Sequence, residues 1–209
     1  MDFGKEIASY LLQIGAVKIS PDKPFTWASG WHSPIYCDNR KTLSYPVIRS
    51  AIRDAFVQHV KARYPQAELI AGVATGAIAI GMLVAQELQL PFVYVRSKPK
   101  GHGMENLIEG DISMAKNVVV IEDLISTGGS SLQAVEALRG AGLDVLGMLA
   151  IFTYGFSVSE DKFRLAGVHL ETLSNYHTLI QFALENQMIQ HYQLESLSQW
   201  RINPSEWGK

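Results

Sequence analysis

Apolar runs alternate with helix-like segments along most of the chain. Val118–Ile121 are four consecutive β-branched residues, which is typical of a central strand buried on both faces. Segments of about a dozen residues with helical character separate such runs. Strands spaced in this way form βαβ units, so the pattern predicts an α/β domain whose parallel sheet is flanked by helices. The predicted strands are 69–73, 92–96, 118–122, 144–154 and 165–174, and the intervening helices are 76–88 and 131–142.

The ends of the chain have other patterns. Phe3, Ile7, Leu11 and Ile14 are spaced by three and four residues, which predicts an amphipathic helix over 2–15. Further expected elements are two short strands and a loop in 24–40, a helix from Pro46 to about Tyr64, a projecting hairpin or mobile loop in 96–118, and C-terminal helices in 175–187 and 191–200.

Length and composition predict one globular domain. The 209 residues are 47% hydrophobic and 18% charged, enough to bury one sizeable core. We expect a single domain over 1–209, with a small N-terminal hood in about 1–40, a core in about 45–175 and C-terminal helices in about 176–203.

Charge and cysteine content exclude several classes of partner. A net charge of −2 and a pI near 6.3 give no reason to expect nucleic acid or an anionic membrane surface. Cys37 is the only cysteine, so no intrachain disulfide can form. The uncharged run 69–85 is too short and too rich in glycine for a membrane span, and residues 1–12 do not resemble a secretory signal. These features predict a cytoplasmic protein.

The segment Val118–Ser130, VVVIEDLISTGGS, combines a buried strand, an acidic pair and a turn of small residues. We expect the strand to end at Glu122–Asp123. In 126–130, hydroxyl groups and two glycines precede a helix, so backbone N–H groups and a helix N-terminus would form a phosphate-binding cradle. The alternative is an ordinary turn between a strand and a helix. Beside a cradle, the acidic pair would hold ribose hydroxyls, Mg²⁺ or both.

This segment resembles the PRPP-binding motif of type I phosphoribosyltransferases. It differs from a Walker P-loop because no lysine follows the glycines, which disfavours nucleoside triphosphate hydrolysis. The segment Val73–Ala77, where a predicted strand turns into a helix, is a weaker candidate for binding pyrophosphate oxygens. Close packing of a helix on a strand would require the same small residues.

A basic segment precedes the motif. Arg96, Lys98, Lys100 and His102 occupy alternate positions of VRSKPKGHG, so an extended chain would place them on one face as an anion clamp. The alternative is a solvated edge strand. The segment resembles the flexible catalytic loop of orotate phosphoribosyltransferases, and Arg96, Lys100 and His102 match that pattern. Ser97 stands where the family usually has a lysine, whose contact is either lost or made by Lys98.

A third segment, FTWASGWHSPIYCDNR, is similar to the family segment that forms a wall of the orotate pocket. Some of its aromatic residues must instead pack in the core. Ala28 stands where many members have a lysine that contacts orotate. Tyr154 stands where some members have an arginine. Arg40 and the backbone around 36–37 are alternatives for holding the orotate carboxylate.

The resemblance implies an enzyme that converts orotate and PRPP into orotidine 5′-phosphate and pyrophosphate, in pyrimidine synthesis. It implies Mg²⁺ carried mainly by PRPP rather than by a protein metal site, and a homodimer with shared active sites. The implied catalytic residues are Lys100, His102 and Asp123, and Ser126 is the implied orotate contact. The implied PRPP-binding residues are Arg96, Lys100, His102, Glu122, Asp123, Leu124, Ile125, Ser126, Thr127, Gly128, Gly129 and Ser130.

Two rival functions remain open at this point. A purine phosphoribosyltransferase would lack the segment SGWHSPIY ahead of the sheet. A PRPP-sensing regulator would keep the cradle without turnover, but such proteins usually add a basic DNA-binding module or lose the loop. An orotate-dependent assay of pyrophosphate release distinguishes all three.

Overall fold

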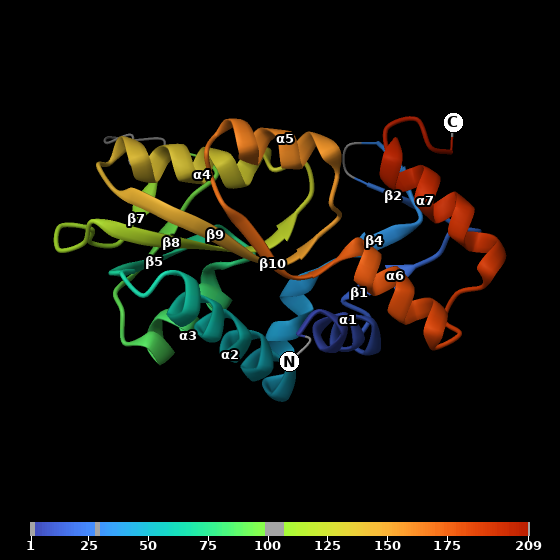
Figure 1. Ribbon diagram of the computed structural model, residues 1–209, viewed down its shortest axis with the longest axis horizontal. Coiled ribbons are helices and arrows are strands. Elements are labelled where there is room, and N and C mark those ends of the chain that lie inside the picture. The colour runs from blue at the N-terminus through green and yellow to red at the C-terminus, as the bar shows by residue number, and fades with distance from the viewer. Residues whose placement is uncertain (1–2, 28–29, 99–106, 209) are drawn as a thin grey trace.

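A six-stranded sheet forms the centre of the computed structural model, which describes residues 3–27, 30–98 and 107–208 (Figure 1). The strand order is β10-β9-β8-β5-β6-β7, and all neighbours are parallel except the antiparallel pair β6 and β7. The strands are β5 (Leu69–Val73), β6 (Phe92–Val95), β7 (Ile108–Glu109), β8 (Asn117–Ile125), β9 (Asp144–Thr153) and β10 (Leu170–Asn175). The predicted parallel sheet is therefore confirmed.

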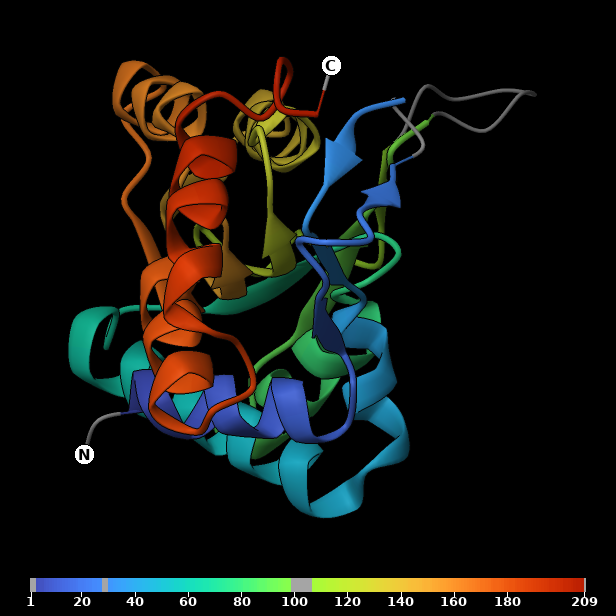
Figure 2. The ribbon, with the colours of Figure 1, turned by 90° about the vertical axis from the view of Figure 1, so that its right-hand side faces the viewer.

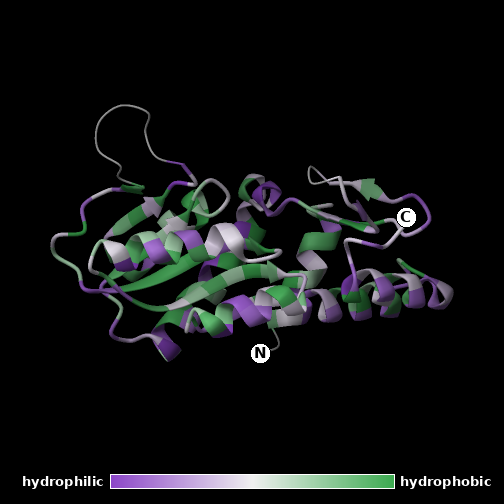
Figure 3. Cartoon of the chain, turned by 90° about the horizontal axis from the view of Figure 1, so that it is seen from above, coloured by the Kyte–Doolittle hydropathy of each residue, from purple (hydrophilic) through white to green (hydrophobic). Residues whose placement is uncertain are grey.

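Helices cover both faces of this sheet because its central strands bury side chains on both sides. Val118 and Val120 face the core beneath α4 (Gly129–Gly140) and α5 (Ser157–Leu165). Val119 and Ile121 alternate with them and face the core beneath α2 (Pro46–Arg63) and α3 (Ile78–Leu88). All four valine and isoleucine side chains are fully buried. In Figure 3 the central strands are mainly hydrophobic in colour, whereas the flanking helices are mixed.

A second group of elements lies at one end of the sheet and joins the two ends of the chain (Figures 1 and 2). Helix α1 packs against α6 and β10. Strands β1 and β4 form one antiparallel pair, and β2 and β3 form another. The members are α1 (Phe3–Gln13), β1 (Val17–Ile19), β2 (Phe25–Thr26), β3 (His32–Ser33), β4 (Ile35–Cys37), η1 (Asn39–Ser44), α6 (Tyr176–Glu185), η2 (His191–Gln193) and α7 (Leu194–Ile202).

The course of the chain through the sheet creates a switch point between the carboxyl ends of β5 and β8, a region called the crevice below. From β5 the chain moves to β6 and β7 on one side, then crosses back to β8 on the other side of β5. In open α/β sheets, ligands bind outside the carboxyl ends of the strands at such a switch point. The crevice between the ends of β5 and β8 is thus the expected position of a site.

Several local features differ from the sequence predictions. Strand β8 continues past Glu122–Asp123 to Ile125, because β9 pairs with it as far as Thr153. Helix α5, strand β1 and the 3₁₀ helix η1 were not predicted. Residues 96–118 were expected to form a projecting hairpin or a mobile loop. In the structure β7 pairs antiparallel with β6, and residues 99–106, between these two strands, lie outside the described residues.

Within the described part of the chain, no helix combines the length and the apolar character needed to cross a bilayer.

Candidate active site

The end of β8 carries the acidic pair into the crevice, and its two carboxyl groups have different surroundings. Glu122 is only 4% exposed. Its Oε1 accepts a hydrogen bond from the backbone N–H of Asp123 at 2.9 Å, and its Oε2 accepts one from the Ser131 hydroxyl at 2.8 Å. Burial and the neighbouring Asp123 carboxylate raise the pKa of Glu122 well above its usual range. Glu122 therefore supports the loop from within the protein.

Asp123 is half-buried and reaches across to the end of β5. A Cβ on Gly76 would overlap its carboxyl group, so the two residues are in direct contact. Gly76 lies in the turn between β5 and α3, where the peptide bond between Ala74 and Thr75 is cis. The Val73–Ala77 turn and the acidic pair therefore meet in the crevice, as motifs at the ends of neighbouring parallel strands should.

The small-residue loop connects β8 to α4 with the geometry of an anion cradle. Gly128 has a φ of 75°, and a Cβ there would lie 2.9 Å from the Phe163 ring, so only glycine fits. A Cβ on Gly129 would meet no heavy atom within 4 Å, which leaves the backbone open on that side. Among the described residues, no side chain caps the N-terminus of α4. Its first N–H groups are therefore available to an anion.

A cavity of about 250 Å³ lies at the start of this loop. It is lined by Thr26, Trp27, Tyr36, Cys37, Leu124, Ser126 and Tyr154. Its walls therefore combine the aromatic segment of the N-terminal part with the end of β8 and the residue after β9. Apolar and aromatic walls with a few polar groups suit a flat heterocyclic ligand. Ser126, the predicted orotate contact, lies in this wall.

The base of this cavity rests on a cluster of aromatic rings from both ends of the chain. Trp200, on α7, is fully buried and packs edge-on against Trp27 and Tyr154, with centroids 5.8 and 5.5 Å apart. Tyr154 also stacks on Phe156 at 5.4 Å. Burial, followed by smaller effects of Cys37, Tyr36 and Tyr176, raises the pKa of Tyr154 well above its usual range. Tyr154 is thus held as a neutral ring.

A second cavity, of about 230 Å³, lies at the other end of the loop. Ser130 lines it together with Arg96 and Ser97 from the base of the hairpin, and its remaining walls come from the ends of β5 and β6, Leu107 and α4. The Arg96 side chain pairs with Glu109 across the hairpin, with Nη1 and Oε1 3.2 Å apart. The loop therefore runs from an aromatic cavity to a cavity whose wall includes the Arg96 side chain.

The structure places some predicted site residues together and leaves others outside its description. Asp123 of the acidic pair lies against Gly76 at the crevice, and Arg96 lines the second cavity together with Ser130 of the loop. Lys100 and His102 lie outside the described residues, as does Ala28. Arg40 forms a bidentate pair with Asp38, donating from Nε to Oδ1 at 2.7 Å and from Nη2 to Oδ2 at 3.1 Å. This pairing lowers the pKa of the Asp38 carboxyl group.

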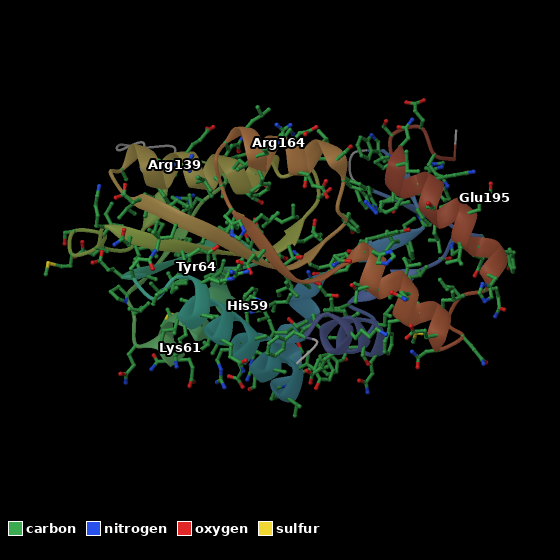
Figure 4. All side chains as sticks on the ribbon, in the orientation of Figure 1. His59, Lys61, Tyr64, Arg139, Arg164 and Glu195 are labelled. Carbon is green, nitrogen blue, oxygen red and sulfur yellow. The ribbon has the colours of Figure 1, made fainter. Side chains whose placement is uncertain are left out.

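Sequence reasoning missed two residues beside the site. Asn39 donates from Nδ2 to the backbone carbonyl of Asp123 at 2.6 Å, and Lys162 on α5 donates to the Thr127 carbonyl at 3.3 Å. Asn39 lies in the segment FTWASGWHSPIYCDNR, where no role was assigned to it, Lys162 lies in no motif, and both are far from the loop in sequence. The unpredicted elements η1 and α5 bring them there. By contrast, two arginines on the same helices contact other groups (Figure 4). Arg139 on α4 donates to the Ala166 carbonyl, and Arg164 on α5 pairs with Asp161.

No group of three or more His, Cys, Asp or Glu side chains in the described ranges could hold a metal ion. The crevice offers the Asp123 carboxylate, since both Glu122 oxygens are already bonded. Mg²⁺ is commonly bound by one or two carboxylates together with substrate phosphates and water. The donor set present therefore fits a magnesium ion that is carried in by a phosphorylated ligand.

Comparisons with known proteins agree with this geometry. Residues 43–186 match the phosphoribosyl transferase domain family. The chain is also 55% identical over its full length, and that of the relative, to orotate phosphoribosyltransferase of Cytophaga hutchinsonii. The chain belongs to the orotate phosphoribosyltransferase family.

Other members of this orotate phosphoribosyltransferase family show the same agreement in sequence and in structure. The Porphyromonas gingivalis orotate phosphoribosyltransferase is 56% identical over 98% of both chains. The crystal structure of orotate phosphoribosyltransferase from Aeropyrum pernix superposes with a TM-score of 0.74 at 28% identity, covering 88% of this chain and 99% of that one. The predicted resemblance is confirmed over nearly the whole length of the chain.

Proposed function

We propose that this protein transfers the 5-phosphoribosyl group of PRPP to orotate, giving orotidine 5′-phosphate and pyrophosphate in pyrimidine synthesis. The single observation that carries the proposal is the loop 126–130, which runs from the aromatic cavity to the second cavity, whose wall includes Arg96. One ligand bound along this loop would present a phosphate to α4 and a ribose to Asp123. Its reacting carbon would face the aromatic cavity, called the base cavity below because the base would bind there. The identity to orotate phosphoribosyltransferases supports orotate as the base.

In this proposal the residues of the chain act mainly by positioning. The N-terminus of α4 and Ser126–Ser130 bind the 5′-phosphate, and the Asp123 carboxylate accepts hydrogen bonds from the ribose hydroxyls. Glu122 stabilises Asp123 from behind, by accepting from its N–H. The aromatic cavity stacks on the flat orotate ring and excludes water, with Ser126 as its hydrogen-bonding partner. Holding both reactants in this geometry lowers the entropic part of the barrier.

In the reaction, the bond between ribose C1 and the pyrophosphate oxygen breaks and the leaving oxygen keeps the electron pair. A ring nitrogen of deprotonated orotate then bonds to C1. Positive charge develops on the ribose and negative charge on the departing pyrophosphate. Arg96, with Lys100 and His102 from the segment outside the described residues, would neutralise the pyrophosphate. Magnesium, when bound with PRPP and Asp123, would supply further charge neutralisation there.

We further propose a homodimer in which Lys100 of one subunit acts at the active site of the other. The family resemblance of the segment VRSKPKGHG supports this arrangement, because in that family the loop reaches into the neighbouring subunit. The described residues provide the base of such a loop, where Arg96 bonds to the Leu107 carbonyl at 2.8 Å.

The test is pyrophosphate release by the purified protein with PRPP and Mg²⁺, comparing orotate with adenine and uracil. Of the three bases, only orotate should support turnover. Release with adenine but not orotate would contradict the proposal in favour of a purine enzyme. Thermal stabilisation by PRPP without turnover on any base would indicate a PRPP-sensing protein instead. A ligand at a hundredfold excess over its dissociation constant stabilises the folded state by about 2.7 kcal/mol, which a melting curve detects.

A further inference from the structure

Asp123 has no register partner on either neighbouring strand. Strand β5 pairs with β8 only as far as Gly72 and Ile121. On the other side, the register passes from Glu122 opposite Ala150 directly to Leu124 opposite Phe152. Side chains take the place of strand partners: the Asp123 N–H donates to Glu122 Oε1 at 2.9 Å, and its carbonyl accepts from Asn39 Nδ2 at 2.6 Å.

Asn39 is itself held firmly. It is 1% exposed, at the start of η1, and its backbone carbonyl accepts from the Thr42 hydroxyl at 2.6 Å. Its side-chain Oδ1 accepts from the Cys37 thiol at 3.2 Å. Burial, together with the nearby Asp123 and Asp38 carboxylates, raises the pKa of Cys37 well above its usual range, so the thiol keeps the proton it donates. A buried amide bonded at both ends has one orientation.

The two partners of Asn39 belong to the two halves of the site. Cys37 lines the aromatic cavity, and Asp123 is the carboxylate of the crevice. Asn39 therefore connects the wall of the base cavity to the backbone that carries the ribose-binding carboxylate, across 84 positions of sequence. We propose that Asn39 is a positioning residue, which fixes the Asp123 carboxylate relative to the base cavity through the Asp123 carbonyl.

This inference rests on the proposed role of Asp123. Reacting groups must be held within a fraction of an ångström, and a misplacement of about 1 Å can cost about 100-fold in rate. The competing explanation is that Asn39 stabilises η1 and has no separate effect on the reaction. The two explanations differ in what happens when the Asp123 carboxylate is already absent.

The experiment is a double-mutant cycle of Asn39→Ala with Asp123→Asn, read out as turnover with saturating orotate and as the PRPP dissociation constant from calorimetry. We expect Asn39→Ala alone to lower turnover about 10- to 100-fold, and to change KM for orotate less than about threefold. In the Asp123→Asn background, Asn39→Ala should change turnover and the PRPP dissociation constant by less than about twofold. The reason is that the effects of residues that act as one unit are not additive. Equal fold-changes in both backgrounds would overturn the proposal.

Thr42→Val is the matched control, because it removes the hydroxyl bond to the Asn39 carbonyl and loosens the same turn without removing the Asn39 side chain. Even if Thr42→Val lowers the melting temperature as much as Asn39→Ala does, it should lower turnover by less than about twofold. A loss as large as that of Asn39→Ala would show that the turn, and not the amide, matters, and would also overturn the proposal. If Asn39→Ala does not fold, Asn39→Asp, which keeps the shape but replaces the donor, takes its place in the cycle. Wild-type turnover with orotate in the same assay tests the proposed function separately.

Discussion

The carboxyl group of Asp123 occupies the space that a side chain on Gly76 would fill. A Cβ at position 76 would overlap all three atoms of that group. Gly76 is not in the left-handed region, so its requirement is for space rather than for an unusual backbone conformation. The turn after β5 and the acidic pair of β8 therefore depend on each other, although 47 positions separate them in sequence.

Gly76→Ala should lower turnover at least about 10-fold by displacing the Asp123 carboxylate, since misplacing a reacting group by about 1 Å can cost 100-fold. The melting temperature should change little, because the Asp123 side chain is only half-buried and can move toward solvent. Gly140→Ala is the matched control, since a Cβ there meets nothing within 4 Å. Turnover equal to the control would refute the contact as a functional constraint.

Asp123→Asn should lower turnover by about two to three powers of ten, about 2.7–4 kcal/mol by analogy with the loss of one transition-state hydrogen-bond partner. The amide keeps the size of the side chain, so the fold should survive. Steady-state kinetics and a melting curve measure the two effects. A melting midpoint that collapses together with activity would indicate a structural role for the carboxylate.

Ser126→Ala should raise KM for orotate about 2- to 10-fold, which corresponds to the net worth of one neutral hydrogen bond, about 0.5–1.5 kcal/mol. KM for PRPP should change less, because in the proposed function the backbone N–H groups of 127–130 hold the phosphate. The comparison of the two KM values in one variant serves as an internal control. Equal rises would place Ser126 on the phosphate instead of the base.

Glu122→Gln should change the pH dependence of stability. The folded-state pKa of Glu122 is raised above its unfolded value, so its contribution is complete below about pH 4.5 and is lost as pH rises through the folded pKa. A glutamine matches the protonated acid and does not titrate. Denaturant unfolding between pH 5 and pH 8 should therefore show wild type losing stability relative to the variant. Parallel curves would mean that Glu122 ionises without cost.

Subunit mixing tests the proposed sharing of active sites between two subunits. Lys100→Ala retains an intact Asp123, whereas Asp123→Asn retains an intact Lys100. A mixed dimer should therefore contain one site with both residues, and activity should rise well above that of either parent. Native mass spectrometry verifies that exchange has occurred. Exchange without recovered activity would show that Lys100 serves its own chain or has no role.

The sequence was sufficient for elements whose burial is uniform. Val118–Ile121 indicate a central strand because any strand buried on both faces needs such residues. Helix α5 was missed because only Ser159 and Phe163 of its nine residues are buried, which leaves no apolar stripe to detect. The 3₁₀ helix η1 has no periodicity and depends on the Asp38 side chain, which accepts from the Arg40 N–H at its start.

For the site, local motifs predicted which residue types gather, but not how each one is held. Glu122 and Asp123 are adjacent and chemically alike in sequence. Their different surroundings arise from Ser131, Gly76 and Asn39, which tertiary folding brings together. The role of Tyr154 in the wall of the cavity likewise depends on Trp200, which lies 46 positions later in the chain.

The contribution of α7 to the base cavity has a consequence for the order in which the site can assemble on the ribosome. The proposed phosphate cradle and the α5 residues that contact it, Lys162 and Phe163, are all synthesised by Leu165, so that half can take shape while the rest is still being synthesised. Trp200 emerges 35 positions after Leu165, and only then can the rings beneath the base cavity close. Under the proposed function, a nascent chain would thus be able to bind PRPP before it could accept a base.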